Sequence, residues 1–282
     1  MYTLRVKNHR NNTLELTNNP CYTVYKIDGL TPPAATVNSS VNTTIDGSTI
    51  NSVRVESRNI VIYMTIEGEV EKNRINLYKY FPLKKTVTLY FTNDTRDVFI
   101  CGTVENIECD LFANKQVAQI SILCPQPYFK SVESLITEFS TVEKGLEFPI
   151  SIEESGIEFS TILSEPRKTI INTGDVETGV IIDLFATGEV VKPIIYDTIK
   201  RTSMALNIDM IKGDKITINT NAGEKGITLL RDGITYNILG NMQPSSAWFT
   251  LDTGDNVFTY ECESGVDNLQ LTFTTPILYG GV

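Results

Sequence analysis

The stretch "CPQPYFKS", Cys124 to Ser131, divides the sequence of 282 residues into two halves of different character. Pro125 and Pro127 end the apolar run that precedes them, because proline cannot donate to a strand ladder and holds the residue before it extended. Tyr128 and Phe129 follow at once, and we expect them to pack the chain down against the first half. The stretch therefore predicts a rigid hinge between two domains.

The balance of charge changes sign at this hinge. Residues 1–130 carry 14 Lys and Arg against 12 Asp and Glu, and residues 131–282 carry 10 against 22, so the net charges are +2 and −12. We therefore expect one domain at 1–130 and another at 131–282. The acidic half repels phosphate backbones and the first half has no basic run, so specific nucleic-acid binding is not expected.

Strand signals dominate the first half. Short runs of β-branched and aromatic residues, several of them alternating with polar ones, are typical of half-buried antiparallel strands. These runs are 2–6, 22–27, 59–68, 86–92, 97–101 and 116–124. The first half is therefore expected to be α+β with β dominant.

Two segments of the first half depart from this pattern. Residues 69–81 are expected to form its one helix, which Pro82 ends. The apolar positions of this helix recur at helical spacing and are Ile75, Leu77, Tyr78 and Phe81. Residues 31–52, rich in Pro, Ser, Thr and Asn, predict a long exposed loop, and loops of this kind are often functional or form interfaces.

The second half consists of short strand signals separated by Gly, Asp and Asn turns. The turns recur at intervals of roughly 8 to 12 residues, which is typical of a β-sandwich or jelly roll. No window of the chain approaches 18 apolar residues, and the first residues lack the apolar core of a secretory signal. We therefore expect a chain that folds in a cytoplasm without a membrane span, and whose five cysteines are small buried hydrophobes.

No catalytic constellation is found. His9 is the only histidine, which excludes mechanisms that need two. The tripeptide at Asp252 to Gly254 resembles the loop of an aspartic protease, but the other candidate stretch has Asn172 in place of the aspartate. Those enzymes need two carboxylates that share a proton. A plain turn between two strands explains the tripeptide.

Acidic residues elsewhere give no better candidate. The pair Glu153 and Glu154 and the group Glu67, Glu69 and Glu71 have the residue type of acid–base pairs, but nothing marks a buried one. The stretch 252–256 lacks the twelve-residue ligand loop of a calcium site. The sequence therefore predicts no enzyme, no cofactor and no metal.

Four motifs follow one another in the first half. They are "LYKYFP" (77–82), "FTNDTR" (91–96), "ICGTVE" (100–105) and "CPQPYFKS" (124–131). In this order they resemble the distal tail protein (Dit) family of long-tailed bacteriophages. The second half is similar to the family as well, in "NTGDVETGVIIDL" (172–184), "IKGDKITINT" (211–220), "WFTLDTGDN" (248–256) and "PILYGGV" (276–282).

The resemblance implies a mainly β protein with a tail-tube-like β-sandwich or barrel that has one helix, followed by a galectin-like jelly roll. It implies a homohexameric, non-enzymatic hub of the distal tail or baseplate, which connects the tail tube to the tail tip and leaves a channel for DNA. The partners are then further copies of the chain, the tail tube protein, and a tail-tip or baseplate protein or tail-associated lysin, with the tape-measure protein as a candidate. The expected location is the tail tip of a phage, prophage or bacteriocin particle.

Within such a ring, Lys84, Lys85 and the stretch 31–52 are candidate contact positions. An alternative is a carbohydrate- or receptor-binding tail component that acts through the jelly roll. Trp248, the single tryptophan, is the candidate for stacking on a sugar ring, although a lone tryptophan at the start of a strand is more often core. The other aromatics that leave room for such a site are Tyr236, Phe249 and Tyr260.

Overall fold

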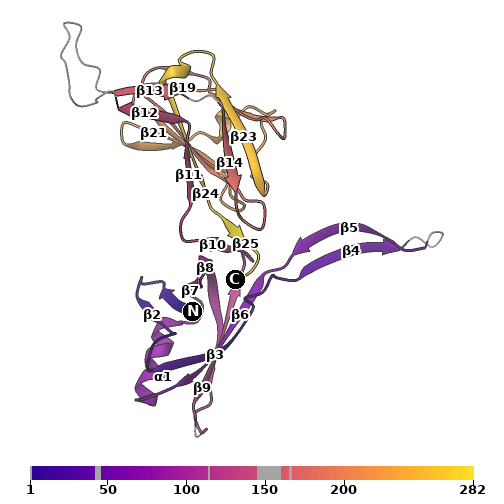
Figure 1. Ribbon diagram of the computed structural model, residues 1–282, viewed down its shortest axis with the longest axis vertical. Coiled ribbons are helices and arrows are strands. Elements are labelled where there is room, and N and C mark those ends of the chain that lie inside the picture. Colours follow the sequence, from indigo (N-terminus) through magenta and orange to yellow (C-terminus); the bar gives the residue numbers. More distant parts are fainter. Residues whose placement is uncertain (1, 42–45, 114, 145–159, 165–166) are drawn as a thin grey trace. The chain divides into compact units, whose positions relative to one another are not determined.

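The computed structural model describes residues 2–41, 46–113, 115–144, 160–164 and 167–282 (Figure 1). Within these ranges the protein is mainly β, with one α-helix and two short 3-10 helices, which confirms the predicted fold class. No helix in this part of the chain has the length and apolar character that crossing a membrane requires. The chain forms two compact units: unit 1 is Met1–Glu133 with Leu278–Val282, and unit 2 is Ser134–Ile277.

The last five residues return to unit 1, whereas the sequence analysis places them in the second domain. They do so because β25 (Leu278–Tyr279) pairs with β10 (Phe129–Ser131), which directly follows the two hinge prolines. In this register Tyr279 lies opposite Phe129, and Leu278 lies opposite Lys130. Unit 1 is therefore made of two pieces of sequence with unit 2 inserted between them.

Unit 1 is built on a nine-stranded sheet of antiparallel pairs. Its main path is β2-β1-β7-β8-β9-β6-β3, and β10 joins β8 to β25. The strands of the path are β1 (Thr3–Asn8), β2 (Thr13–Glu15), β3 (Tyr22–Asp28), β6 (Arg58–Ile66), β7 (Thr86–Thr92), β8 (Asp97–Cys109) and β9 (Val117–Cys124).

One face of this sheet forms the core of unit 1. Leu4, Phe91 and Val98 lie opposite one another across β1, β7 and β8, and all three are buried. Ile62 and Ile120 repeat the arrangement across β6 and β9. Because directly paired residues of antiparallel strands share a face, the period-two pattern of the sequence becomes one continuous apolar surface.

Helix α1 (Val70–Tyr80) confirms the predicted helix and ends just before Pro82. It contacts β1 and β6 and buries Leu77, and Phe81 is buried directly after its end. Ile75 and Tyr78, predicted to lie on the same apolar face, are 46% and 38% exposed. The helix therefore touches the sheet along a narrower stripe than its apolar spacing suggests.

Two strands occupy the stretch that the sequence predicts to be a loop. β4 (Ala35–Val41) and β5 (Ser48–Val55) form an antiparallel ribbon, which we call the arm, and Figure 1 shows it running out from the sheet of unit 1. Exposure was predicted correctly, but the loop was not. Val and Thr supply β-propensity within a composition of Ser and Asn that is typical of turns, and this composition conceals the strands.

Unit 2 contains a six-stranded and a four-stranded antiparallel sheet. The larger runs β11 (Leu135–Glu138), β24 (Leu269–Thr275), β15 (Ile181–Ala186), β20 (Lys215–Asn219), β21 (Gly226–Arg231), β22 (Ile234–Asn237). The smaller runs β14 (Arg167–Asn172), β23 (Gly254–Glu261), β17 (Ile194–Asp197), β18 (Thr202–Ala205). Two further pairs are β12 (Ser140–Lys144) with β13 (Ser160–Ser164), and β16 (Val190–Val191) with β19 (Asp209–Met210).

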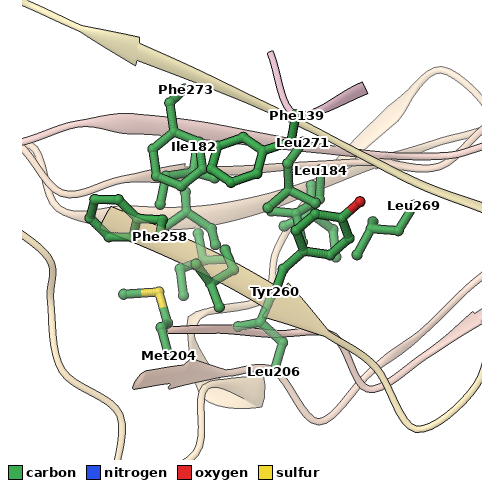
Figure 2. Close-up of a cluster of buried hydrophobic side chains, with 14 of the residues drawn as sticks. Phe139, Ile182, Leu184, Met204, Leu206, Phe258, Tyr260, Leu269, Leu271 and Phe273 are labelled. Atoms are coloured by element: carbon green, nitrogen blue, oxygen red, sulfur yellow. The ribbon is translucent and has the colours of Figure 1, made fainter. Parts of the chain in front are cut away.

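The two larger sheets of unit 2 share one core, as expected of a β-sandwich. Figure 2 shows Phe258 and Tyr260 of β23 among Phe273 and Leu271 of β24. The rings of Phe258 and Phe273 have centroids 5.0 Å apart, and those of Phe139 and Phe273 are at the same distance. Alternate side chains of both sheets therefore interlock as the turn-rich pattern of the sequence predicts.

Candidate functional site

Arg58, the first residue of β6, is the centre of the site where the sequence motifs of unit 1 meet. Its side chain is almost fully buried, with 3% of the residue exposed. Nε donates to the carbonyl of Pro127 (2.6 Å), Nη1 to those of Gly29 (2.5 Å) and Thr31 (2.9 Å), and Nη2 to that of Gly280 (2.5 Å). One guanidinium thus joins the start of the arm, the hinge and the end of the chain.

The charge of Arg58 is stabilised by dipoles, since all four of these acceptors are backbone carbonyls. The guanidinium also lies over the ring of Phe129, 4.6 Å from its centroid, in cation–π geometry. Burial lowers the pKa of Arg58 from its usual value, although an arginine remains protonated in proteins. Removing one of the acceptors leaves a buried donor unsatisfied, which costs about 1–3 kcal/mol.

Arg96 makes a second attachment to the end of the chain. It closes the "FTNDTR" turn between β7 and β8, where the side chain of Asn93 accepts from the amides of Thr95 (2.9 Å) and Arg96 (2.7 Å). The turn directs the guanidinium onto the ring of Tyr279, 4.2 Å from its centroid, and Nη1 donates to the carbonyl of Gly281. Two of the family motifs are therefore in direct contact.

The remaining contacts join the end of the chain to the start of the arm. We call residues 278–282 the strap and Gly29–Pro32 the arm root. The amide of Val282 donates to the carbonyl of Leu30 (3.1 Å). Gly281 packs so closely that a Cβ there would lie 2.9 Å from Pro32 Cδ, and Gly29 has a φ of +89° and no space for a Cβ beside Asn59. Both glycines are required by close backbone approach.

The arm itself has one apolar and one polar face. Val37 pairs with Val53 and Ser39 with Ile50, so their side chains point to the same side of the ribbon. The exposed apolar side chains are Val37, Val41, Ile50 and Val53, at 51 to 76% exposure. The opposite face is polar and carries hydrogen bonds such as Asn38 to Ser52 (3.0 Å) and Thr36 to Glu56 (2.8 Å). Four exposed β-branched residues on a two-stranded ribbon are typical of a contact surface.

The lysines predicted as contact positions lie just after the motif "LYKYFP" in the sequence, in the turn between α1 and β7. Lys84 and Lys85 are both exposed, and Lys84 has a left-handed φ of 62°. No contact in the described part of the chain assigns them a role, and they stay a prediction. The stretch 31–52, in contrast, contains most of the arm.

Trp248 packs against the core of unit 2 and is only partly exposed. The ammonium of Lys225 lies 5.5 Å from its ring centroid. Phe249 and Tyr260, which left room for a sugar site in the sequence, are 2% and 4% exposed and belong to the core. Tyr236 is exposed on β22. These four residues therefore do not form a sugar-binding surface of several exposed aromatic rings, because Phe249 and Tyr260 are buried.

The two stretches compared with an aspartic protease are neighbours in unit 2. Asn172 lies opposite Gly254 where β14 pairs with β23, and its Nδ2 donates to the carbonyls of Val176 (3.0 Å) and Leu251 (3.2 Å). Asp252 is ion-paired with Lys200 at 2.9 Å. Asn172 closes a turn and carries an amide, and Asp252 is exposed. The two residues therefore do not form a pair of carboxylates that share a proton.

The other acidic candidates of unit 1 have local partners. Glu69 pairs with Lys72 (2.7 Å) and Glu71 with Arg74 (2.6 Å) on the exposed surface of α1, and Glu67 accepts from Thr65 (3.0 Å). His9 is exposed. Glu153 and Glu154 lie outside the described residues, and among those described no group of three or more His, Cys, Asp or Glu could hold a metal ion.

Comparison with family models finds a likeness within unit 2. Residues 173–276 match the model of the siphovirus-type tail component, C-terminal domain. The resemblance to distal tail proteins is thereby confirmed, and a search of curated sequences finds no significant match.

Solved structures extend the likeness of fold from the tail-component domain to the whole chain. The SPP1 Dit protein (gp 19.1), described as a paradigm of the hub adsorption apparatus in phages that infect Gram-positive bacteria, is 11% identical, with a TM-score of 0.69 over 99% of both chains. A chain of the phage p2 baseplate in its activated conformation with Sr is 13% identical, with a TM-score of 0.53 over 98% of both. The Ca form gives 12% and 0.52 over 98% of both.

Sequence reasoning found the motifs but missed Arg58, which joins two of them through the carbonyls of Pro127 and Gly280. Arg58 follows a serine and precedes the strand "NIVIYMTI", and no local pattern distinguishes it from a solvated arginine. A usable signal existed in the glycines, since Gly29 and Gly281 both permit close approach of backbone. Only the fold shows that Gly29 and Gly280 meet at Arg58 and that Gly281 meets Arg96.

Proposed function

We propose that the protein is a structural component of a phage tail, a distal tail hub that assembles as a hexameric ring of identical chains. The observation that carries the proposal is the fold shared with SPP1 Dit over the full length of both chains, together with the tail-component domain of unit 2. As the family resemblance implies, the ring joins the tail tube to the tail tip and leaves a channel for DNA. Its role is structural rather than catalytic.

The arm supports self-association. Its apolar face of Val37, Val41, Ile50 and Val53 is exposed in the single chain, and an isolated two-stranded ribbon is marginally stable in water. A closed ring requires a heterologous contact, in which one patch of a copy binds a different patch of the next. The proposal assigns the arm to this contact, with the apolar face covered by the neighbouring copy.

The distribution of charge is compatible with a channel for DNA. The first 130 residues have a net charge of only +2, so a ring built from them does not attract phosphates strongly enough to retain DNA. The acidic second half repels its own copies and favours solubility at the outside of such a ring. We also propose that unit 2 is galectin-like and decorates the outside of the ring.

The proposed partners are further copies of the chain, the tail tube protein and a tail-tip or baseplate protein. The proposed location is the tail tip of the virion. The likeness of fold to SPP1 Dit, a hub protein, and to a chain of the p2 baseplate supports this assignment, at 11 to 13% identity.

Mass photometry and negative-stain microscopy of the purified full chain test the proposal. Six copies of a 31.5 kDa chain give a particle of about 190 kDa, with a six-fold ring and a central hole in class averages. The measurement is repeated over a series of protein concentrations and with the tail tube protein added, because ring closure can depend on either. Chains that stay monomeric throughout and bind cell-wall glycan beads instead would support the carbohydrate-binding alternative and contradict the hub.

A further inference from the structure

The strap is attached to unit 1 by more contacts than the end of a chain needs for packing alone. Within five residues it pairs with β10, accepts from Arg58 and Arg96 through Gly280 and Gly281, places Tyr279 under a guanidinium, and donates from Val282 to Leu30. Two of these contacts lead to the arm root, the bond from Val282 to Leu30 and the bond of Gly280 to Arg58.

Arg58 couples the strap to the arm. The same guanidinium that holds Gly280 also holds the carbonyls of Gly29 and Thr31, which lie at the point where the chain leaves β3 for the arm. If the strap leaves, one buried donor of Arg58 loses its acceptor, and Leu30 loses the amide of Val282. Buried donors without acceptors are costly, so the remaining two bonds to the arm root are weakened as well.

We propose that the strap fixes the arm root, so that the arm keeps its direction only while residues 278–282 are docked. In this arrangement residues 278–282, which follow unit 2 in the sequence, control the direction of the arm, which precedes unit 2 in the sequence. The coupling between the strap and the arm root rests on contacts within unit 1 alone. Its consequence for assembly rests on the proposed function, in which the arm binds a neighbouring copy.

Two variants release the strap to different extents. A chain that ends at Ile277 removes it. Gly281→Val retains it but adds a side chain where Cβ alone would lie 2.9 Å from Pro32 Cδ and 3.0 Å from the Leu30 carbonyl, which pushes the strap away from the arm root. Gly240→Val is the matched control, because a Cβ at this exposed position of the short 3-10 helix Leu239–Asn241 in unit 2 meets nothing within 4 Å.

Limited proteolysis with thermolysin measures the opening of the arm root, because this protease cuts before large apolar residues such as Leu30. Cleavage at Leu30 is expected to be about tenfold faster or more in both strap variants and unchanged in Gly240→Val. The emission of Trp248, the only tryptophan and part of unit 2, should stay the same and shows that this unit is folded.

Cleavage at the wild-type rate in both strap variants overturns the proposal. So does uniform loss of protection across β7 and β8, since the strap is then only one part of a cooperative core. Mass photometry separates the two levels. If cleavage at Leu30 is faster in the strap variants but the wild-type protein forms no rings, the strap proposal holds and the hub proposal is contradicted. If both strap variants form the same rings as the wild-type protein, strap control of assembly is contradicted.

Discussion

The guanidinium of Arg96 lies 4.2 Å from the centroid of the Tyr279 ring and thereby connects the β7–β8 turn to the end of the chain. Replacing Arg96 by Ala removes this cation–π contact and the bond to the Gly281 carbonyl. We expect the free energy of unfolding of unit 1 to fall by about 1–2 kcal/mol. Urea titration with hydrogen exchange of peptides from β7 and β8 measures the change.

Arg5→Ala is the control for this variant, since Arg5 is exposed and lies 5.4 Å from the Tyr90 ring on the same sheet without touching the strap. Its effect should stay within about 0.5 kcal/mol. Equal losses in the two variants would show that stacking on the sheet, rather than attachment of the strap, stabilises unit 1.

Arg58 should be among the most sensitive positions of unit 1. Arg58→Met keeps the unbranched stem of the side chain but removes the guanidinium and its four hydrogen bonds to the carbonyls of Gly29, Thr31, Pro127 and Gly280. We expect a loss of at least about 3 kcal/mol in the free energy of unfolding, because these bonds are made by one buried charged group and are lost together. Hydrogen exchange of β6 and β9 during urea titration is the measurement. A loss below about 1 kcal/mol would mean that water replaces the guanidinium without cost.

A charge on the apolar face of the arm should prevent self-association. Val37→Asp places a carboxylate on the surface that the proposal covers with a second copy, and we expect the dissociation constant of the oligomer to rise at least about 100-fold. Asn38→Asp adds the same charge to the polar face of the same strand and should change it by less than about threefold. Mass photometry over a concentration series compares them. Equal effects of the two substitutions would exclude the apolar face as the contact.

Cys124, the first residue of the hinge stretch, should resist thiol reagents in the folded protein. Burial raises the pKa of its thiol to about 12, whereas Cys101 on the neighbouring strand β8 is exposed. Since the thiolate is the reactive form, we expect Cys124 to react with a disulfide reagent at pH 8 at least about 100-fold more slowly than Cys101. Mass spectrometry of labelled peptides tests this, and Cys101→Ser should remove the fast phase.

The raised pKa of Cys124 also makes the free energy of unfolding depend on pH. The folded state retains a proton that the unfolded chain loses near the usual cysteine pKa of about 8.5. The contribution of Cys124 to stability is therefore complete below about pH 8.5 and is lost as the pH rises toward 12. Cys124→Ala should flatten this part of the curve of unfolding free energy against pH, and an unchanged slope would contradict the assignment.

Asp214 of unit 2 gives the opposite dependence at acid pH. Its buried carboxylate accepts from Arg231 at 2.5 to 3.1 Å and from the amide of Ile211 at 2.8 Å, and the arginine holds its pKa below the usual value. Stability from this group is present above the unfolded pKa of about 3.9 and is lost as the pH falls through the lower folded value. Asp214→Asn should lower the free energy of unfolding of unit 2 by about 1–3 kcal/mol at pH 7 and by less at pH 2. The fluorescence of Trp248 measures the unfolding.

Most strands of the two units and the helix could be predicted because their signals are local. Alternation of apolar residues fixes which face of β6 or β9 is buried, and Pro82 and Pro125 end their elements by removing a donor. The arm was missed because its β-branched residues are interspersed with Ser and Asn, which are typical of turns. The strap could not be predicted, since Tyr279 and Phe129 become neighbours only when the fold closes, and the acceptors of Arg58 are backbone atoms that leave no trace in side-chain composition.

The pairing of β10 with β25 places the chain's departure from unit 1 and its return to it on adjacent strands, with Lys130 opposite Leu278. Unit 2 is therefore an insertion between two neighbouring positions of an otherwise continuous sheet. Such an insertion can be exchanged for one of another size or sequence without altering the register of the host. This layout lets unit 2 change in length or sequence while the strands that carry the arm stay the same.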